Sequence, residues 1–434
     1  MVSRWRGLVV ERVLRDVWVI SGRAGDDPFV GDIAVANGRI THIDRSTRRP
    51  VRPTRAVLPG LANAHLHPTP ALLRTALASI TIDDNDRSPL VGRLYEALRA
   101  DREALQLGAR LALAETMSSG ATCGCLHEYL APEVAARQAA ELGFPCVVAV
   151  HPGEPGWREV LARVRDTGAE VMLAGLNEND PANTDEALRE LAAWAGELGV
   201  RVHAHVSETR ERHEHMRART GRTPVAHYRE MGLLEHLYAV HCTAVEDEDV
   251  ELLAAHDVPV VVTPSSEALL GDGIAPLAAL REAGVRVGLG TDGAAWAGGE
   301  DVLRELTAAA LLSRAVGGPG ALRGGEVIEL ATLGGARVLG CESERGSVEV
   351  GKRADLVVLD LERPGLRPVL EGPLSTVREV IAFAATGADV IETMIGGTAV
   401  HRRGGTPLVE VDAVQDAAER VWRRAGGDRA RTWL

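Results

Sequence analysis

The chain has 434 residues, of which 45% are hydrophobic and 25% are charged, fractions that are typical of soluble globular proteins. The length predicts either one large barrel or a barrel with a satellite domain. The formal net charge of −13 argues against a general polyanion-binding role, because the averaged field repels phosphate backbones, so nucleic acid is not expected as a partner.

Nothing in the sequence predicts membrane insertion or secretion. Residues 1–16 lack the continuous apolar run of a signal peptide, and no later stretch is long and uncharged enough to span a bilayer. The cysteines are odd in number and scattered, unlike a secreted disulfide framework: Cys123, Cys125, Cys146, Cys242 and Cys341. We therefore expect a cytoplasmic protein with reduced thiols.

The first predicted elements are a strand and a hairpin. Val17–Ile20 and Asp32–Val35 have the composition of strands. The dipeptide Asn37-Gly38 before a third strand at Arg39–Ile43 predicts a type I′ turn.

From about residue 58 to residue 312, short Val-, Ala- and Leu-rich runs alternate with longer amphipathic segments, as in successive βα units. Helices are predicted from Asp101 to a stop at Gly120 and from Thr184 to a stop at Gly199. The predicted strands end near His67, His127, His151, Leu176, Val206, His241, Thr263 and Asp292. Eight such repeats predict an α/β protein with a closed (β/α)8 barrel and a functional site at the carboxyl ends of the strands.

The C-terminal part returns to strands, which we expect to pair with the N-terminal ones in one small β-sandwich beside the barrel. These strands are predicted at residues 346–350, 354–359, 390–395 and 398–400. The expected domains are a sandwich of residues 1–57 and 343–411, a barrel of residues 58–342, and a helix of residues 412–434 with Trp422 and Trp433.

His65 and His67 end the first predicted barrel strand. Side chains two residues apart on a strand face the same way, so both imidazoles point into the barrel mouth, where two neutral nitrogens suit Zn²⁺ or Fe²⁺. An isolated His-x-His pair is a weak motif, so the remaining strand ends decide its meaning.

Three more strand ends carry suitable side chains: His205 on the fifth strand, His241 on the sixth and Asp292 on the eighth. A barrel brings these ends to one rim. Three of the imidazoles and the carboxylate around a divalent metal leave room for a nucleophilic water, which the remaining histidine, His241, would position. Glu208, three residues after His205, is placed to shuttle protons. The alternative is a set of satisfied interior histidines with a helix-capping aspartate, and for His203 alone this is the preferred interpretation.

The sequence resembles the amidohydrolase superfamily, in its branch of cytosine-deaminase-like enzymes, S-adenosylhomocysteine/methylthioadenosine deaminases, guanine deaminases and triazine hydrolases. The resemblance covers nearly the whole chain. It rests on PGLANAHLHP (59–68), VHAHVSETR (202–210), YREMGLLEHLYAVHC (228–242), GDGIAPLAALREAGVRVGLGTDGAA (271–295), and EVIELATLGGARVLG with GSVEVGKRADLVVLD (326–360).

The resemblance implies one catalytic metal per chain, zinc first, with iron or manganese left open by the ligand types. Its implied ligands are His65, His67, His205 and Asp292. It also implies that Glu208 and His241 handle protons and orient the hydroxide, that Asp292 accepts a proton from the water, and that the protein is a homodimer or a larger homo-oligomer.

Related binuclear hydrolases bridge two metals with a carboxylated lysine in the barrel. The only lysine of this chain, Lys352, falls in the predicted sandwich, so composition excludes such a bridge. The remaining route to a second metal is Glu178, near the end of the fourth strand.

The chain departs from the family pattern where substrate is usually held. Glu178 replaces a histidine, Glu267 replaces an asparagine, and the segments 294–298 and 81–86 lack the usual polar and Trp-Leu residues. These changes make adenosine-type substrates less expected.

Glu178 and Glu267, with Glu128, favour a cationic or NH-rich small-molecule substrate such as an amidine, a guanidine or an aminated heterocycle. Alternatively, each of these carboxylates caps a helix or meets an arginine at the rim. Further candidate substrate contacts are His127, His151 and Trp296, whereas Cys123 and Cys125 are expected in the barrel core.

The sequence thus predicts a mononuclear metal-dependent aminohydrolase that releases ammonia from a C–N bond. One alternative keeps the site and hydrolyses a C–Cl, cyclic imine or amide bond. A second is a non-catalytic binding protein, which should have lost at least one central residue, and this chain has lost none of them.

Overall fold

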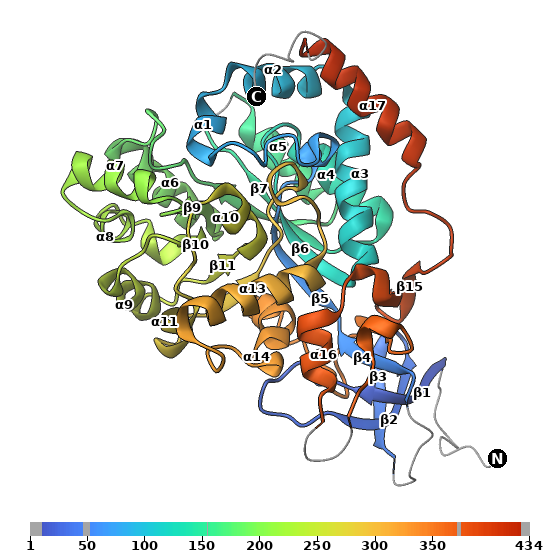
Figure 1. Cartoon of the computed structure of the whole chain (residues 1–434). Helices are drawn as coiled ribbons and strands as arrows, with labels where there is room; N and C mark the ends of the chain where they lie inside the picture. Colours follow the sequence, from blue (N-terminus) through green and yellow to red (C-terminus); the bar gives the residue numbers. More distant parts are fainter. Residues whose placement is uncertain (1–10, 47–52, 154, 371–374, 427–434) are drawn as a thin grey trace.

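The computed structural model describes residues 11–46, 53–153, 155–370 and 375–426, and it contains two sheets (Figure 1). In the larger sheet, eight consecutive strands pair in parallel in chain order, and their side chains are almost all buried, which explains the continuous apolar runs. The strands are β5 (Leu61–Leu66), β6 (Ala121–His127), β7 (Cys146–Val150), β8 (Glu170–Ala174), β9 (Val202–Val206), β10 (Leu237–His241), β11 (Val260–Val262) and β12 (Val287–Leu289).

Backbone hydrogen bonds between β5 and the segment after β12 close this sheet into a barrel. The N–H groups of Thr291 and Asp292 both donate to the carbonyl oxygen of His65 at 3.0 Å. In return, the N–H of His67 donates to the carbonyl oxygen of Asp292 at 3.2 Å. The predicted (β/α)8 barrel is confirmed.

Helices surround the barrel, and the two with a predicted start begin at the expected residues. Asp101 accepts a hydrogen bond from the N–H of Ala104, and Thr184 accepts one from the N–H of Ala187, so both side chains cap their helices. The helices are α1 (Ile82–Arg87), α2 (Pro89–Arg99), α3 (Arg102–Ser118), α4 (Pro132–Leu142), α5 (Trp157–Arg165), α6 (Asp185–Leu198), α7 (Arg210–Thr220), α8 (Pro224–Glu230), α9 (Asp247–Ala255), α10 (Pro264–Leu270), α11 (Leu277–Glu282), α12 (Ala294–Ala297), α13 (Val302–Gly317), α14 (Gly324–Glu329) and α15 (Gly335–Val338).

Both ends of the chain combine in a seven-stranded sheet beside the barrel, as predicted (Figure 1). Its order is β15-β14-β13-β4-β1-β2-β3, and the antiparallel pair β4 and β13 joins the two ends. The strands are β1 (Arg12–Val19), β2 (Phe29–Ala36), β3 (Arg39–Arg45), β4 (Arg55–Pro59), β13 (Leu356–Asp360), β14 (Val390–Ile395) and β15 (Thr398–Arg402). Positive φ angles of 51° at Asn37 and 72° at Gly38 confirm the type I′ turn.

One strand prediction is wrong, because residues 346–350 form turns rather than a strand. Gly346 has a φ of +81°, a left-handed conformation that interrupts an extended run. The segment is nevertheless held in place: the N–H of Val348 donates to the carbonyl oxygen of Ser21 at 2.9 Å, and the side chain of Arg23 donates to Glu349.

The C-terminal helix and the domain limits follow the prediction in part. Helix α17 (Val411–Arg424) packs against α2 and α3. Residues 427–434, including Trp433, lie outside the described residues. A further helix, α16 (Val377–Ala384), packs against α13 and α14. The predicted boundary at residue 57 falls inside β4, and the domain limits stay a prediction. Among the described residues, no helix is long and apolar enough to cross a membrane.

The barrel closure generates a first prediction at Gly290. A Cβ atom there would lie 2.7 Å from the carbonyl oxygen of His65 and 2.8 Å from its amide nitrogen, so Gly290→Ala must push β5 away. We expect the free energy of unfolding to fall by about 1–3 kcal/mol, as measured by urea denaturation. The matched control is Gly92→Ala in α2, where a Cβ meets nothing within 4 Å and should stabilise the helix by about 0.5–1 kcal/mol. Equal effects of the two substitutions would contradict the closure argument.

Candidate metal centre and active site

Three imidazoles and one carboxylate come together at the carboxyl ends of the barrel strands. Nε2 of His65 lies 3.5 Å from Oδ1 of Asp292, and Nε2 of His67 lies 3.2 Å from the same oxygen. His205 at the end of β9 presents a nitrogen within 4.8 Å of the nitrogens of both histidines. All four side chains are buried, so the structure brings the four expected metal ligands together.

The donor set fits a divalent ion such as zinc. Two donors on a tetrahedral zinc ion, each about 2.1 Å from the metal, lie about 3.4 Å apart, which matches the two distances to Asp292. Nε2 of His65 is buried and has no hydrogen-bond partner among the described residues. Its other nitrogen, Nδ1, lies 3.0 Å from Nε2 of His203, and such a partner commonly orients a metal-binding imidazole. His203 therefore supports His65.

The electrostatics suit metal binding. Burial lowers the pKa of His65 to about 3 and holds the pKa of His205 well below its ordinary value, so both rings are neutral near pH 7. Burial would raise the pKa of Asp292, but its contacts with His65 and His67 hold that pKa well below the ordinary range. His65 and His205 thus offer neutral imidazoles, and Asp292 offers an ionised carboxylate.

His127, at the end of β6, is a fourth imidazole within 4.8 Å of the ligand histidines. Its Nε2 lies 3.3 Å from Nε2 of His151, so these two predicted substrate contacts lie against each other. One oxygen of Asp292 contacts both His65 and His67, and Asp292 as the fourth ligand stays a prediction.

Glu208 and His241 form a pair next to the ligands. Oε1 of Glu208 lies 3.5 Å from Nε2 of His241, while Nδ1 of His241 lies 3.0 Å from the hydroxyl of Thr263 and 3.5 Å from Oε1 of Glu267. Burial lowers the pKa of His241, but the surrounding carboxylates outweigh it and raise that pKa to about 9. The ring is therefore an imidazolium that faces Glu208.

A cavity of about 260 Å³ opens above these groups. Tyr95, Tyr129 and Trp296 supply aromatic walls, and the indole N–H of Trp296 donates to Oδ1 of Asn85 at 3.2 Å. The lining residues are His67, Ile82, Asn85, Asp86, Tyr95, Arg99, Tyr129, Leu130, Asn177, His205, Glu208, Arg212, Asp292 and Trp296. Of the predicted substrate contacts, Trp296 lies in this lining.

Glu178, Glu267 and Glu128 do not belong to the described lining of this cavity, so their role as substrate contacts stays a prediction. All three are fully buried and accept hydrogen bonds from backbone N–H groups: Glu178 from Ser207, Glu267 from Thr263, and Glu128 from Thr69 and Leu130. The helix-capping and loop-fixing alternative therefore describes them better. Burial raises the pKa of Glu178 to about 7.

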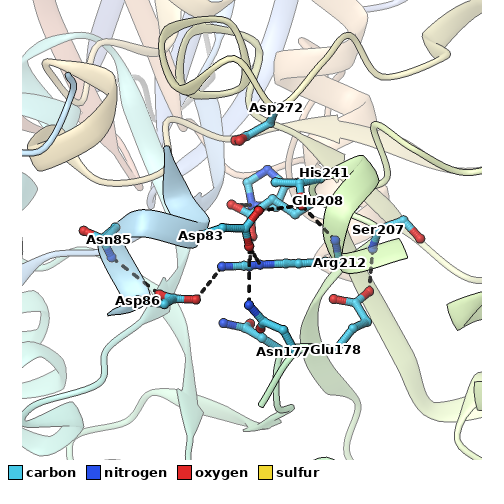
Figure 2. A network of polar contacts seen from close by, with 12 residues as sticks. Asp83, Asn85, Asp86, Asn177, Glu178, Ser207, Glu208, Arg212, His241 and Asp272 are labelled. Atoms are coloured by element: carbon cyan, nitrogen blue, oxygen red, sulfur yellow. Dashed lines mark hydrogen bonds and ion pairs between the residues drawn. The ribbon is translucent and has the colours of Figure 1, made fainter. Parts of the chain in front are cut away.

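Besides Glu208 and Asp292, the carboxylate of Asp86 on α1 lines the cavity, and the sequence interpretation missed it. Arg212 in α7 was missed as well, although it follows Glu208 by four residues, a spacing that lets two side chains meet at the start of a helix. Figure 2 shows Arg212 between Glu208 and the α1 carboxylates. No sequence motif marked Tyr95 and Tyr129 as residues of the site.

Several strand ends at the site adopt a left-handed backbone although they are not glycine. The φ angles are 47° at Ser207, 70° at His241 and 62° at Asp292. Such conformations cost of order 1–3 kcal/mol each and concentrate at functional sites, where they redirect side chains. Here they turn the chain sharply at the rim of the barrel.

Lys352 lies outside the barrel, next to the turns at residues 346–350. Its Nζ donates to the carbonyl oxygens of Glu342 and Arg345 and to the hydroxyl of Ser347. The only lysine is thus committed to a structural role, in agreement with the exclusion of a carboxylated-lysine bridge.

Comparisons with known proteins agree with this geometry. Residues 56–400 match the model of the amidohydrolase family. A 5-methylthioadenosine/S-adenosylhomocysteine deaminase of Moorella thermoacetica is 32% identical, over 82% of this chain and 84% of its own. A 5′-deoxyadenosine deaminase of Methanothermobacter thermautotrophicus is 32% identical, over 84% of this chain and 86% of its own.

Among solved structures, an adenosine deaminase from Xanthomonas campestris with bound zinc superimposes with a TM-score of 0.83. It is 27% identical, and the match covers 96% of this chain and 98% of that one. The family model matches most of the sequence, and the relatives and the shared fold agree with it. The chain therefore belongs to the amidohydrolase family.

Proposed function

We propose that this chain is a zinc-dependent aminohydrolase that replaces an amino group on an aminated heterocycle, or on an amidine- or guanidine-like group, by oxygen and releases ammonia. The observation that carries the proposal is that His67, His205, Asp292 and Glu208 all line one buried cavity, with His65 beside them. The deaminases among the relatives support the reaction, and the relative with bound zinc supports the metal.

One zinc ion would be held by His65, His67, His205 and Asp292. When bound, such an ion lowers the pKa of a water ligand and so supplies a nucleophile near neutral pH. Ser266 donates its hydroxyl proton to Oδ2 of Asp292, which leaves Oδ1 directed toward the two histidines.

Glu208 moves the protons of the reaction. Its carboxylate takes one proton from the attacking water and passes it to the nitrogen adjacent to the reacting carbon. It then carries the second proton of that oxygen to the amino group, so that the oxygen stays on the carbon as a carbonyl and the amino nitrogen leaves as ammonia. The imidazolium of His241, held by Thr263 and Glu267, faces the same space and stabilises negative charge on the oxygen that attacks.

The cavity walls favour a flat substrate with N–H groups. Tyr95, Tyr129 and Trp296 offer aromatic surfaces against which a ring can stack. Asp86 and Asn177 add hydrogen-bonding atoms to the same lining. Asp86 is thus a carboxylate of the lining that favours NH-rich ligands.

Three further parts of the proposal rest on the sequence. A cytoplasmic location follows from the reduced-thiol pattern, and a homodimeric or larger assembly from the family resemblance. The choice of zinc as the metal rests on the ligand types, and these ligand types also bind iron and manganese.

The ligand assignment predicts that Asp292→Asn loses metal. Removal of one carboxylate charge should lower the affinity for zinc by more than about 100-fold, because even the partners of metal ligands contribute 10–100-fold. Metal content by plasma emission spectrometry should fall from one zinc per chain to a small fraction. Asp272→Asn is the matched control, since Asp272 lies near Glu208 but outside the ligand set. An Asp292→Asn protein with full metal and full activity would show that the ligand set is wrong.

The role of Glu208 predicts that Glu208→Gln lowers kcat by about 10²–10⁴-fold with the metal still bound, because the amide keeps the shape but cannot exchange the proton. Ammonia release under saturating substrate measures kcat, and metal analysis confirms the loading. Full turnover in this variant would refute the proton-transfer assignment.

The substrate is tested by ammonia release from zinc-loaded protein across aminated purines, pterins, pyrimidines, triazines and guanidino compounds, with Asp292→Asn as the inactive control. The panel includes 5′-substituted adenosines, because the relatives are named for them although the loop sequences depart from that pattern. If a fully metal-loaded protein released no ammonia from any of these compounds, the result would exclude deamination of these classes and favour hydrolysis of another bond.

A further inference from the structure

Arg212 is a buried arginine whose guanidinium meets three carboxylates. It lies in the first turn of α7, and its side chain is only 1% exposed. Nη1 donates to Oε2 of Glu208, Nε donates to Oδ1 of Asp83 at 2.9 Å, and Nη2 donates to Oδ2 of Asp86 at 2.6 Å. Figure 2 shows the planar group lying among the three acids. A buried guanidinium needs such partners, since an unpaired charge in this position is strongly disfavoured.

Two of the three acids belong to α1, the short helix that forms one wall of the cavity through Ile82 and Asp86. The third, Glu208, comes from a different part of the chain, the segment that follows β9. Arg212 therefore joins a cavity wall to the carboxylate that transfers protons.

Asp83 reinforces this junction from inside α1. Its Oδ2 accepts a hydrogen bond from the hydroxyl of Thr209 at 3.0 Å, and its Oδ1 accepts one from the side-chain amide of Asn179 at 3.3 Å. The loops after β8 and β9 are thereby tied to α1 together with Arg212.

The contact with Arg212 also sets the direction of Glu208. One carboxylate oxygen, Oε2, is engaged by the guanidinium, so the other, Oε1, is directed toward Nε2 of His241 at 3.5 Å. A carboxylate is planar, and fixing one oxygen restricts the rotation that would move the other away from the cavity.

The charges in the network explain why an arginine serves here. Burial acts to lower the pKa of Arg212, but Glu208 and Asp86 outweigh it and hold that pKa above its ordinary value. The guanidinium stays charged, and its fork geometry reaches three acids at once, which a lysine ammonium cannot do in the same way.

We propose that Arg212 is the positioning residue of this active site, which directs the Glu208 carboxylate for proton transfer and simultaneously holds α1 in place as a wall of the cavity. The first half rests on the proposed function of Glu208. The second half concerns the fold of the cavity and stands without it.

The first half is tested by a double-mutant cycle on an active substrate. Arg212→Lys should lower kcat by about 10–100-fold in the wild-type background, with zinc content unchanged, because the ammonium no longer orients Glu208. In the Glu208→Gln background the same substitution should change the residual kcat by less than about 3-fold, since no carboxylate remains to be positioned. Equal losses in both backgrounds would show that Arg212 acts on structure alone and would overturn this half.

Asp83→Asn is the matched variant, because it weakens the tie to α1 and leaves the contact between Arg212 and Glu208. We expect it to raise KM several-fold with kcat within about 3-fold of wild type, whereas Arg212→Lys should mainly lower kcat. A fall in kcat as large as that of Arg212→Lys, with KM unchanged, would contradict separate roles for the two contacts.

The second half is tested by hydrogen–deuterium exchange, which needs no substrate. In Arg212→Lys, amides of residues 82–87 should exchange about tenfold faster or more, while peptides from α6 and β12 keep their wild-type rates. Unchanged exchange in α1 would overturn the wall-holding role. Wild-type protein that releases no ammonia from the panel would refute the proposed reaction, and the exchange result would still decide the tie between Arg212 and α1.

Discussion

The hydrogen bonds that close the barrel between β5 and the segment after β12 also assemble the proposed metal centre. The carbonyl oxygen of His65 accepts from the amides of Thr291 and Asp292, so the segment that carries His65 and His67 is joined directly to Asp292, the third proposed ligand. Gly290 permits this approach, because any Cβ there would overlap His65. A shift of this seam by a fraction of an ångström would therefore change both the fold and the ligand geometry.

Behind the ligands, buried polar groups hold each functional side chain in one orientation. His203 contacts His65, Ser266 donates to Asp292, and Glu267 with Thr263 holds His241. These groups lie on the strands or on the helix turns that follow them, so the rigid barrel fixes most of the chemistry. The exception is α1, which comes from the long connection after β5 and depends on polar contacts for its position.

The barrel could be predicted because buried parallel strands appear as continuous apolar runs, and the candidate ligands followed because strand ends meet at one rim. The directions of side chains beyond the strand ends could not be predicted. Glu178 follows β8 and Glu267 lies in α10, and each turns one carboxylate oxygen to a backbone amide, because a buried carboxylate takes the N–H donors that are close by. The role of Arg212 depended on the position of α1, for which the sequence offered no pattern.

The single lysine has a consequence for the range of chemistry open to this cavity. Apart from the histidines, every other basic side chain is an arginine, whose guanidinium stays protonated and does not act as a nucleophile, while the amino group of Lys352 is bound to three oxygens outside the barrel. Schiff-base formation with a carbonyl compound requires a free amine close to the ligand. A substrate or product that bears an aldehyde or ketone can therefore occupy the cavity without being captured by the protein as an imine.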